Sequence, residues 1–299
     1  MIDSTLLSGS NLKTDDIKFL KYLVGNGGPE RSDFDKYTSL VNNLDPSFTE
    51  DFREIIKPVL VNDTLAGHAF RKPYGYPGDF ALIDHIYQFY YTEDSRYRKW
   101  DDIFQNQPAV NAVRNRKEYF IKQLKIINAQ GKRDINVLIL GSGPATDVNE
   151  YLTDYPARTI SFDLLDFDQC AIDFSMKKNE KFNKQISYKR INVLRFKPYK
   201  MYDLIWSAGL FDYFKDKHFV YLLQKYMSCL AEDGEFVIGN FSTENPTRKT
   251  MEIMLDWFLN HRSKSDLQNI ALEAGIDKKM VKIDTEPLGI NLFLKIRQP

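Results

Sequence analysis

The sequence of 299 residues has little cysteine, no net charge and no long apolar run. Its two cysteines, Cys170 and Cys229, lie far apart, which excludes a disulfide-rich scaffold and a cysteine-ligated metal cluster. The 41 basic residues balance the 41 acidic ones, so nucleic acid meets no overall positive field. The N-terminal residues lack a basic and apolar leader, and no stretch is long enough to cross a bilayer. We therefore predict a cytoplasmic protein with no membrane span, no nucleic-acid partner and no metal site.

Internal repeats and low-complexity tracts are also missing, so we expect one or two compact globular parts. Residues 1–125 show the periodicity of amphipathic helices, for example over 48–60 and 101–124. From residue 126 onward, short apolar runs alternate with helical segments, which is typical of a parallel sheet covered by helices. We predict an N-terminal helical subdomain over residues 1–125 and an α/β domain over residues 126–299.

The α/β domain is organised around residues 135–147, INVLILGSGPATD. An apolar run typical of a buried strand ends at Gly141, Ser142 and Gly143, and Pro144 fits the first turn of a following helix. Because glycine has no Cβ, such a turn is tight and lets a ligand approach the backbone. Free N–H groups at the start of a helix then face that ligand. Two glycines at a strand-to-helix turn also occur without any ligand, so the next unit has to be considered.

The next predicted strand supplies an acid at a suitable distance from the glycine turn. Residues 159–165 are apolar and rich in strand-forming side chains, and Asp166 follows them. An acid at the end of the second strand can accept hydrogen bonds from ribose hydroxyls, whereas the alternative is an N-cap or a surface acid. Asp168 suits the N-cap role better, since a helix over residues 169–178 begins directly after it. The third glycine of the dinucleotide fingerprint is missing after Gly143, which argues against a dehydrogenase.

Five further strands and three more helices complete the predicted domain, the helices lying at residues 217–230, 247–260 and 265–275. The strands are predicted at residues 186–191, 202–207, 235–240, 279–285 and 290–296. The last two are joined through a Pro-Leu-Gly turn and form a hairpin. Residues 247–260 are predicted to be helical, and their methionines and aromatic residues at helical spacing are typical of a core.

Four segments, in their order along the chain, resemble class I (Rossmann-like) S-adenosylmethionine-dependent methyltransferases: LILGSGPATD, LLDFDQ, YDLIWSAGLFDYF and LAEDGEFVIGNF. The resemblance extends from residue 133 to the C-terminus. It implies a Rossmann-like seven-stranded methyltransferase sheet with an antiparallel last strand, and S-adenosyl-L-methionine as the cofactor. The residues that it places around the cofactor are Gly141, Ser142, Gly143, Asp166, Phe167, Asn192, Val193, Ser207, Ala208 and Gly209, with Asn192 next to the adenine amine.

Three segments are similar to a narrower group: HAFRKPYGYPGDFALIDHIY, AVNAVRNRKEYF and DLIWSAGLFDYF. They resemble bacterial methyltransferases that make methyl esters of 3-hydroxy fatty acids used as quorum signals. This chain has Tyr74 where that group more usually has an arginine, and Pro77 where it has an alanine. The change at Tyr74 bears on the substrate, because an arginine there is a candidate contact for a carboxylate. The cofactor prediction is independent of it, since it depends on the motifs of the sheet.

One part of the helical region cannot be regular, because residues 72–80, KPYGYPGDF, contain two prolines and two glycines. This segment is either a rigid connection between helices or a lid whose tyrosines and acid meet the cofactor or the substrate. On the helix that follows, Arg114 and Arg116 are either solvated or bind a carboxylate, of methionine or of an acidic substrate. We predict cofactor contacts for Tyr76, Asp79 and Arg114.

Methyl transfer from a sulfonium is an in-line displacement, in which the protein mainly positions the reactants and excludes water. A carboxylate acceptor needs no general base, whereas a hydroxyl acceptor needs one. We predict Tyr76, Asp212 and Tyr213 as catalytic residues and a small or fatty-acid-like molecule as the methyl acceptor, and a homodimer stays open. Two other classes also stay open: a protein of this fold that binds the cofactor without turnover and acts as a regulatory partner, and a nucleotide-binding oxidoreductase.

Overall fold

A computed structural model of the chain describes residues 12–129, 131, 134–155 and 160–298. The chain forms two compact units. Unit 1 comprises Met1–Asn111 and Pro246–Phe258, and unit 2 comprises Ala112–Asn245 and Leu259–Pro299. This division after Asn111 and the predicted division after residue 125 both lie within one helix, α8 (Pro108–Ala129).

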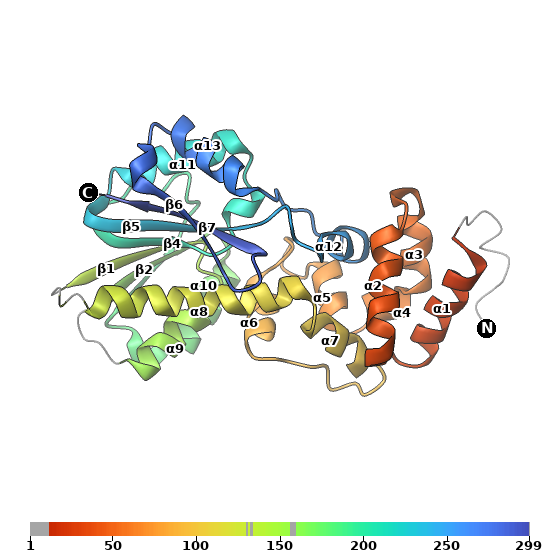
Figure 1. Cartoon of the computed structure of the whole chain (residues 1–299). Coiled ribbons are helices and arrows are strands. Elements are labelled where there is room, and N and C mark those ends of the chain that lie inside the picture. The colour runs from red at the N-terminus through yellow and green to blue at the C-terminus, as the bar shows by residue number, and fades with distance from the viewer. Residues whose placement is uncertain (1–11, 130, 132–133, 156–159, 299) are drawn as a thin grey trace. The chain divides into compact units, whose positions relative to one another are not determined.

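In the described residues, unit 2 contains one seven-stranded sheet with the order β3-β2-β1-β4-β5-β7-β6 (Figure 1). The strands are β1 (Ile135–Leu140), β2 (Ile160–Asp166), β3 (Ile186–Arg190), β4 (Tyr202–Ser207), β5 (Leu230–Phe241), β6 (Val281–Thr285) and β7 (Asn291–Arg297). Neighbouring strands from β3 to β5 pair in parallel, and β7 pairs antiparallel to both β5 and β6. The predicted sheet with its antiparallel last strand is thereby confirmed. Residue 159, the predicted start of β2, lies outside the described residues.

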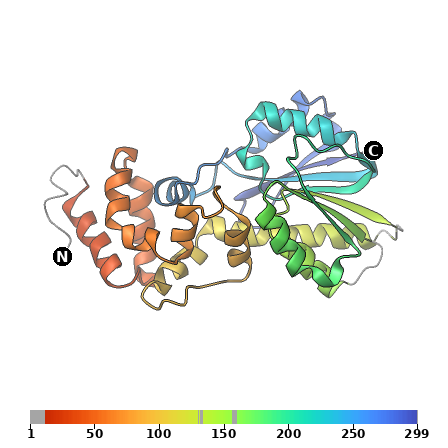
Figure 2. The same ribbon diagram turned by 180° about the vertical axis from the view of Figure 1, so that it is seen from behind.

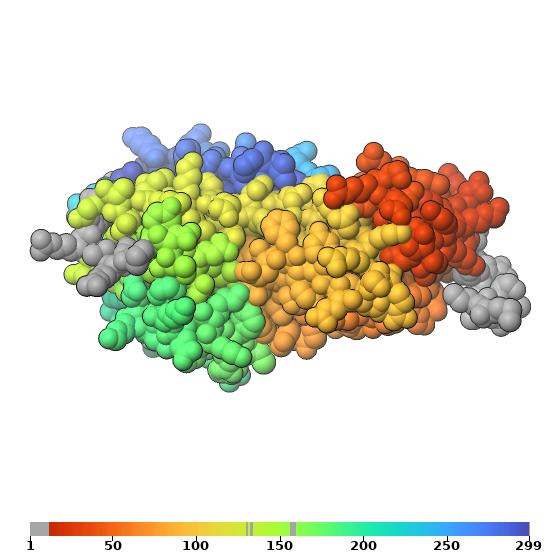
Figure 3. Space-filling model, turned by 90° about the horizontal axis from the view of Figure 1, so that it is seen from below, coloured from red at the N-terminus to blue at the C-terminus, as the bar shows by residue number. Residues whose placement is uncertain are grey.

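Helices cover both faces of this sheet, as parallel strands require. On one face, α8 and α9 (Thr146–Asp154) bury apolar side chains against the strands, with Phe120 and Trp206 at the centre. On the other face, α11 (Asp216–Met227) and α13 (Lys264–Glu273) form a second core. Figure 2 shows the strands between α11 and α10 (Gln169–Lys178), and Figure 3 shows the yellow-green atoms of α8 beside the green atoms of α9. The two cores fix the carboxyl ends of the parallel strands β1 to β5 along one edge.

Unit 1 consists of helices in the described residues. They are α1 (Thr14–Gly25), α2 (Phe34–Asn43), α3 (Thr49–Ile55), α4 (Lys57–Val61), α5 (Leu65–Arg71), α6 (Phe80–Tyr87), α7 (Arg98–Gln105) and, from far along the chain, α12 (Arg248–Leu255). Helix α12 contacts α2, α3 and α5. The hydroxyl of Tyr37 donates to Met254 Sδ at 3.0 Å, and Met251 and Trp257 are also buried. The core interpretation of the methionine and aromatic stripe is therefore confirmed for these residues, whereas Phe258 at its end is 61% exposed.

Prolines account for two of the helices whose extents were predicted wrongly. The helix predicted over residues 247–260 ends at Leu255 for another reason, because Asp256 has a left-handed φ of 51°. Residues 48–60 form two short helices, because Pro58 lies in the first turn of a new helix instead of continuing α3. Pro108 likewise begins α8, so residues 101–124 do not form one helix. Pro144 lies before α9 rather than in its first turn, since the residue between them has a left-handed φ of 48°.

No helix in the described part of the chain is long and apolar enough to cross a membrane.

Candidate functional site

The turn after β1 has the backbone geometry that glycine permits. Gly141 and Gly143 have φ values of 69° and 53°, in the left-handed region that disfavours other residues. The N–H groups of Gly141 and Ser142 donate to the Leu165 carbonyl at 2.9 and 3.0 Å, which attaches the turn to the end of β2. A Cβ added at Gly143 would meet no atom within 4 Å. The turn is thus fixed on its β2 side and open at Gly143.

Asp166 lies beside this turn and supports it. Its Oδ2 accepts a hydrogen bond from the Gly143 N–H at 2.9 Å, and its Oδ1 accepts one from the Asp168 N–H at 3.0 Å. The side chain is buried, and burial raises the pKa of Asp166 above its ordinary value. Each carboxylate oxygen keeps a further lone pair, so Asp166 can accept a ribose hydroxyl while it holds the turn. Asp168 caps α10 by accepting from the Cys170 N–H, as predicted.

The ends of β2, β3 and β4 carry the other residues predicted to contact the cofactor. Asn192 is exposed after β3, and its Oδ1 accepts a backbone N–H of its own loop at 2.9 Å. Val193 is buried, whereas Phe167 after β2 is 55% exposed. Ser207 is buried and donates to the Leu140 carbonyl at 2.9 Å, which ties the end of β4 to the end of β1. These residues lie at the same sheet edge as the glycine turn, and their contacts with a cofactor stay predictions.

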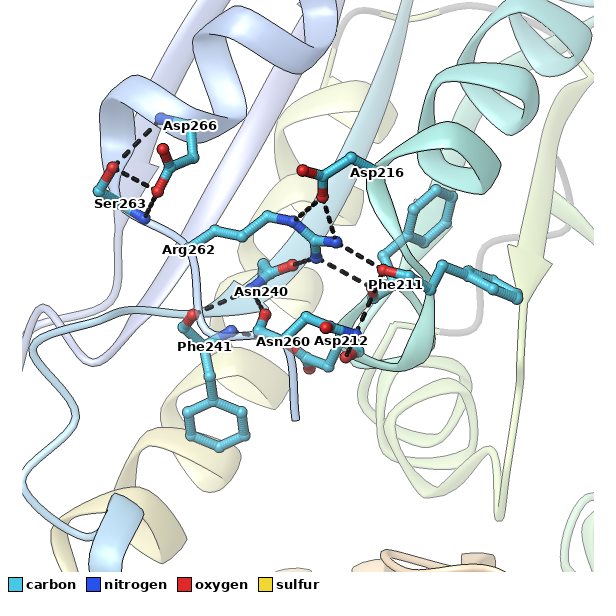
Figure 4. A network of polar contacts seen from close by, with 10 residues as sticks. Phe211, Asp212, Asp216, Asn240, Phe241, Asn260, Arg262, Ser263 and Asp266 are labelled. Carbon is cyan, nitrogen blue, oxygen red and sulfur yellow. Dashed lines mark hydrogen bonds and ion pairs between the residues drawn. The ribbon is translucent and has the colours of Figure 1, made fainter. Parts of the chain in front are cut away.

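After β4 the chain passes through a buried polar network centred on Arg262 (Figure 4). Arg262 is 4% exposed, donates to two carbonyls of the loop after β4 and pairs with Asp216 at 2.8 Å. It also donates to Asn240 Oδ1 at 2.7 Å. One guanidinium therefore holds this loop against the end of β5. The loop contains Asp212 and Tyr213, two of the three predicted catalytic residues.

Asp212 and Tyr213 differ in their surroundings although they are neighbours in the chain. Asp212 is 1% exposed and accepts a hydrogen bond from the Phe241 N–H at 2.7 Å. Burial raises the pKa of Asp212 to about 7, although Arg116 and Arg262 favour its ionised form. Tyr213 is 40% exposed. The carboxyl is therefore held inside by the main chain, and the phenol is the more accessible of the two groups.

The buried position of Asp212 makes stability depend on pH. Its folded pKa of about 7 lies above the ordinary 3.8, so between these values the folded chain binds more protons than the unfolded one. Stability should therefore fall as the pH rises from about 4 to 7. Asp212→Asn keeps an acceptor for the Phe241 N–H and is expected to reduce this slope by up to about 1.4 kcal/mol per pH unit. Urea unfolding of both proteins across this range measures the slopes, and equal slopes would contradict the burial of an ionisable carboxyl.

Two further buried acids provide an internal reference for that experiment. Burial raises the pKa of Asp101 and of Asp147 to about 6 in each case. Both are present in the wild type and in Asp212→Asn, so they contribute equally to the two slopes. Only the difference between the slopes reports on Asp212.

In unit 1, the segment of residues 72–80 is irregular up to the start of α6, as predicted. Asp79 is buried there and caps α6 by accepting a backbone N–H at 2.9 Å. Both of its carboxylate oxygens also lie 2.9 Å from His68 Nε2. Asp79 thus has a structural role that the sequence did not indicate. Tyr76 and, on α8, Arg114 are half-buried, and the contacts of all three with a cofactor stay predictions.

Comparison with known proteins bears on the fold. No protein-family model and no curated protein matches the sequence. The apo structure of the S-adenosylmethionine-dependent methyltransferase SibL aligns with a TM-score of 0.52 at 14% identity, over 83% of this chain and 76% of that one. The chain has the class I methyltransferase fold. A protein of Bordetella parapertussis described as a possible exported protein aligns with a TM-score of 0.68 at 15% identity, over 100% of both chains.

Two buried polar side chains near the ends of the sheet strands were not predicted from the sequence. Arg262 lies in a polar segment, HRSKSD, in which nothing indicates a buried position. Asn291 begins β7 and is completely buried, and within the described residues neither atom of its side-chain amide has a hydrogen-bond partner. Arg116 entered the sequence analysis only as an alternative to Arg114, yet Arg116 is the buried one of the two. A buried polar residue at a strand end has no periodicity that separates it from an exposed one.

Proposed function

We propose that the protein is an S-adenosyl-L-methionine-dependent methyltransferase acting on a small molecule. The observation that carries the proposal is the glycine turn after β1. This turn is open at Gly143, and the Gly143 N–H donates a hydrogen bond to Asp166. Three features fit the cofactor: the open turn, the spare lone pairs of Asp166, and the buried Ser142 hydroxyl, which has no hydrogen-bond partner within the described residues. When bound, S-adenosyl-L-methionine supplies a methyl group on a sulfonium.

The residues of the sheet edge then act by positioning. Asp166 orients the ribose through its hydroxyls, and Asn192 and Val193 border the adenine. Ser207 keeps the ends of β4 and β1 together, so the acceptor and the methyl donor meet beside Ala208 and Gly209. Such positioning and the exclusion of water can supply most of the acceleration of an in-line displacement.

We further infer that the acceptor is methylated on oxygen, at a carboxylate or a hydroxyl. The sequence resemblance to ester-forming methyltransferases supports this, and so does the lack of net charge, which disfavours nucleic acid. A carboxylate is ionised at neutral pH and needs no base. Tyr213, the accessible group of the loop after β4, would orient the acceptor. Asp212, with a pKa near 7, is the candidate base for a hydroxyl acceptor.

Calorimetry with S-adenosylhomocysteine tests the cofactor assignment. Gly143→Val puts a side chain into the open side of the turn and should weaken binding more than about tenfold, a loss above about 1.4 kcal/mol. Gly275→Val is the matched control, because Gly275 also has a positive φ, of 83°, and no atom within 4 Å of an added Cβ. Both variants carry a similar backbone strain of about 1–2 kcal/mol. Equal binding by Gly143→Val and Gly275→Val would rule out this placement of the cofactor.

We also propose that the protein is cytoplasmic. Cys170 is exposed and Cys229 is buried, and both are unpaired, as is usual in a reducing compartment.

Methyl transfer to a panel of 3-hydroxy fatty acids, aromatic acids and phenols distinguishes an enzyme from a cofactor-binding regulator. Size-exclusion chromatography with light scattering determines whether the protein is a homodimer.

A further inference from the structure

Arg116 is a buried cation at the end of β4. It lies one turn before Phe120 on α8, on the side of the helix that packs against the sheet. It is 6% exposed, and its Nε has no hydrogen-bond partner within the described residues. The guanidinium rests on Gly209, where a Cβ would lie 2.8 Å from Nη1 and 3.3 Å from Cζ. Because a buried guanidinium donor without a hydrogen-bond partner is destabilising, this placement indicates a role in binding an anion.

A second buried polar group without a partner lies at the same turn. Asn291 is 0% exposed, and in the described part of the chain neither its Oδ1 nor its Nδ2 is hydrogen-bonded. A Cβ added at Gly239 would lie 3.1 Å from Asn291 Nδ2 and would overlap the carbonyl oxygen of Ala208. Since Ala208 directly precedes Gly209, Arg116 and Asn291 flank one dipeptide just beyond β4. Two independent side chains therefore converge on the place where a methyl acceptor would lie.

The chemistry of these groups matches a single carboxylate. A guanidinium presents a planar fork that binds two carboxylate oxygens, and an amide N–H can donate one more hydrogen bond. Two acids lie near this pair: Asp212 interacts electrostatically with Arg116, and Glu286 accepts from the Asn291 backbone N–H at 3.2 Å. These acids disfavour a doubly charged phosphate, because one guanidinium cannot offset so much negative charge in a buried place.

We infer that Arg116 and Asn291 form a binding site for the carboxylate of the methyl acceptor, an inference that rests on the proposed function. Their position favours the acceptor over the cofactor. The glycine turn and Asp166 lie at the ends of β1 and β2, whereas Gly209, Gly239 and Asn291 lie at β4, β5 and β7, on the other side of β1. The methionine end of the cofactor carries the same chemical group, so the experiment must separate the two sources.

The test compares acids with their neutral amides as probes. Octanoate and octanamide, and benzoate and benzamide, are titrated into the protein with and without S-adenosylhomocysteine, and binding is followed by NMR. At least one acid is expected to bind about tenfold more tightly than its amide, and Arg116→Gln should remove this preference. Arg297→Gln is the matched control, because Arg297 belongs to the same unit, is 57% exposed and should leave the preference unchanged. A wild-type protein that prefers neither acid overturns the inference.

If Arg116→Gln folds poorly, Gly209→Ala tests the same binding preference. Gly209→Ala retains the charge but displaces the guanidinium, and it should also abolish the preference for the acid. An unchanged preference in either variant, with a native circular dichroism spectrum, overturns the inference.

The source of the carboxylate is decided with 5′-methylthioadenosine, which lacks the amino-acid end of the cofactor. If Arg116→Gln weakens S-adenosylhomocysteine but not 5′-methylthioadenosine, the site belongs to the cofactor and the assignment to the acceptor is overturned. Equal affinities of the variant and the wild type for both nucleosides support the acceptor. Failure of the wild type to bind S-adenosylhomocysteine contradicts the proposed function, while the acid and amide titrations without it still test the site.

Discussion

Arg262→Met is expected to lower the free energy of unfolding by about 3–5 kcal/mol. The substitution removes the donors to Asn240 Oδ1 and to two loop carbonyls, and each buried acceptor left without a partner costs about 1–3 kcal/mol. The ion pair with Asp216 contributes less, because the Asp216 side chain is 66% exposed and well solvated. The loss of main-chain hydrogen bonds therefore exceeds the loss of the ion pair. Urea unfolding measures the change.

Two controls isolate the effect of burial at Arg262. Arg297→Met removes an arginine that is 57% exposed and pairs with Asp233 at 3.4 Å, and it should change stability by less than about 1 kcal/mol. Arg262→Lys keeps the charge but not the planar fork, so most of the loss should remain. A variant Arg262→Lys as stable as the wild type would show that charge alone is needed and would contradict the argument from hydrogen-bonding geometry.

Gly239→Ala should be comparably destabilising, by about 3 kcal/mol or more. An added methyl group at this position in β5 would overlap the carbonyl oxygen of Ala208 and lie 3.1 Å from Asn291 Nδ2. Backbone cannot move aside as a flexible side chain can, so the ends of β4 and β5 must separate. Overpacking of a core usually costs about 1–3 kcal/mol, and a clash with backbone lies at the upper end or beyond. Thermal unfolding and native-state hydrogen exchange of β4 and β5 measure the effect.

Gly25→Ala is the control for the loss of a glycine as such. A Cβ at Gly25 meets no atom within 4 Å and φ is not positive there, so alanine should be neutral or slightly stabilising. If Gly239→Ala unfolds at the same temperature as Gly25→Ala, β4 and β5 do not approach each other as closely as the structure shows.

The strands were predictable because their signal is local. β4 coincides with the predicted residues 202–207, since an apolar run bounded by polar residues specifies a buried strand without reference to any other part of the chain. Helix extents were less predictable within unit 1. Pro58 and Pro108 each lie in the first turn of a helix, and a proline in an apolar periodic stretch is compatible with either a break or a start.

The residues of the candidate site likewise include some that local sequence predicted and some that it did not. The glycine turn and Asp166 were predicted from adjacent motifs, and the structure places them in direct contact. The buried positions of Arg262 and Asn291 were not predicted, because the residues around them are remote in the sequence. The pairing of Asp79 with His68 was missed for a related reason, since an acid in a tyrosine-rich loop reads as a ligand contact as readily as a helix cap.

The entry of α12 into unit 1 has a consequence for the order of events during synthesis. Residues up to Asn111 leave the ribosome first, but Tyr37 and Arg53 have partners on Met254 and Ile253. At about 5–20 residues per second, those partners arrive roughly 10–40 s later. During that interval the surface that will receive α12 is uncovered while the strands of unit 2 are still emerging. Because the N-terminal part of the chain is made first and α12 is made late, the surface of unit 1 that receives α12 is exposed longest to chaperones and proteases.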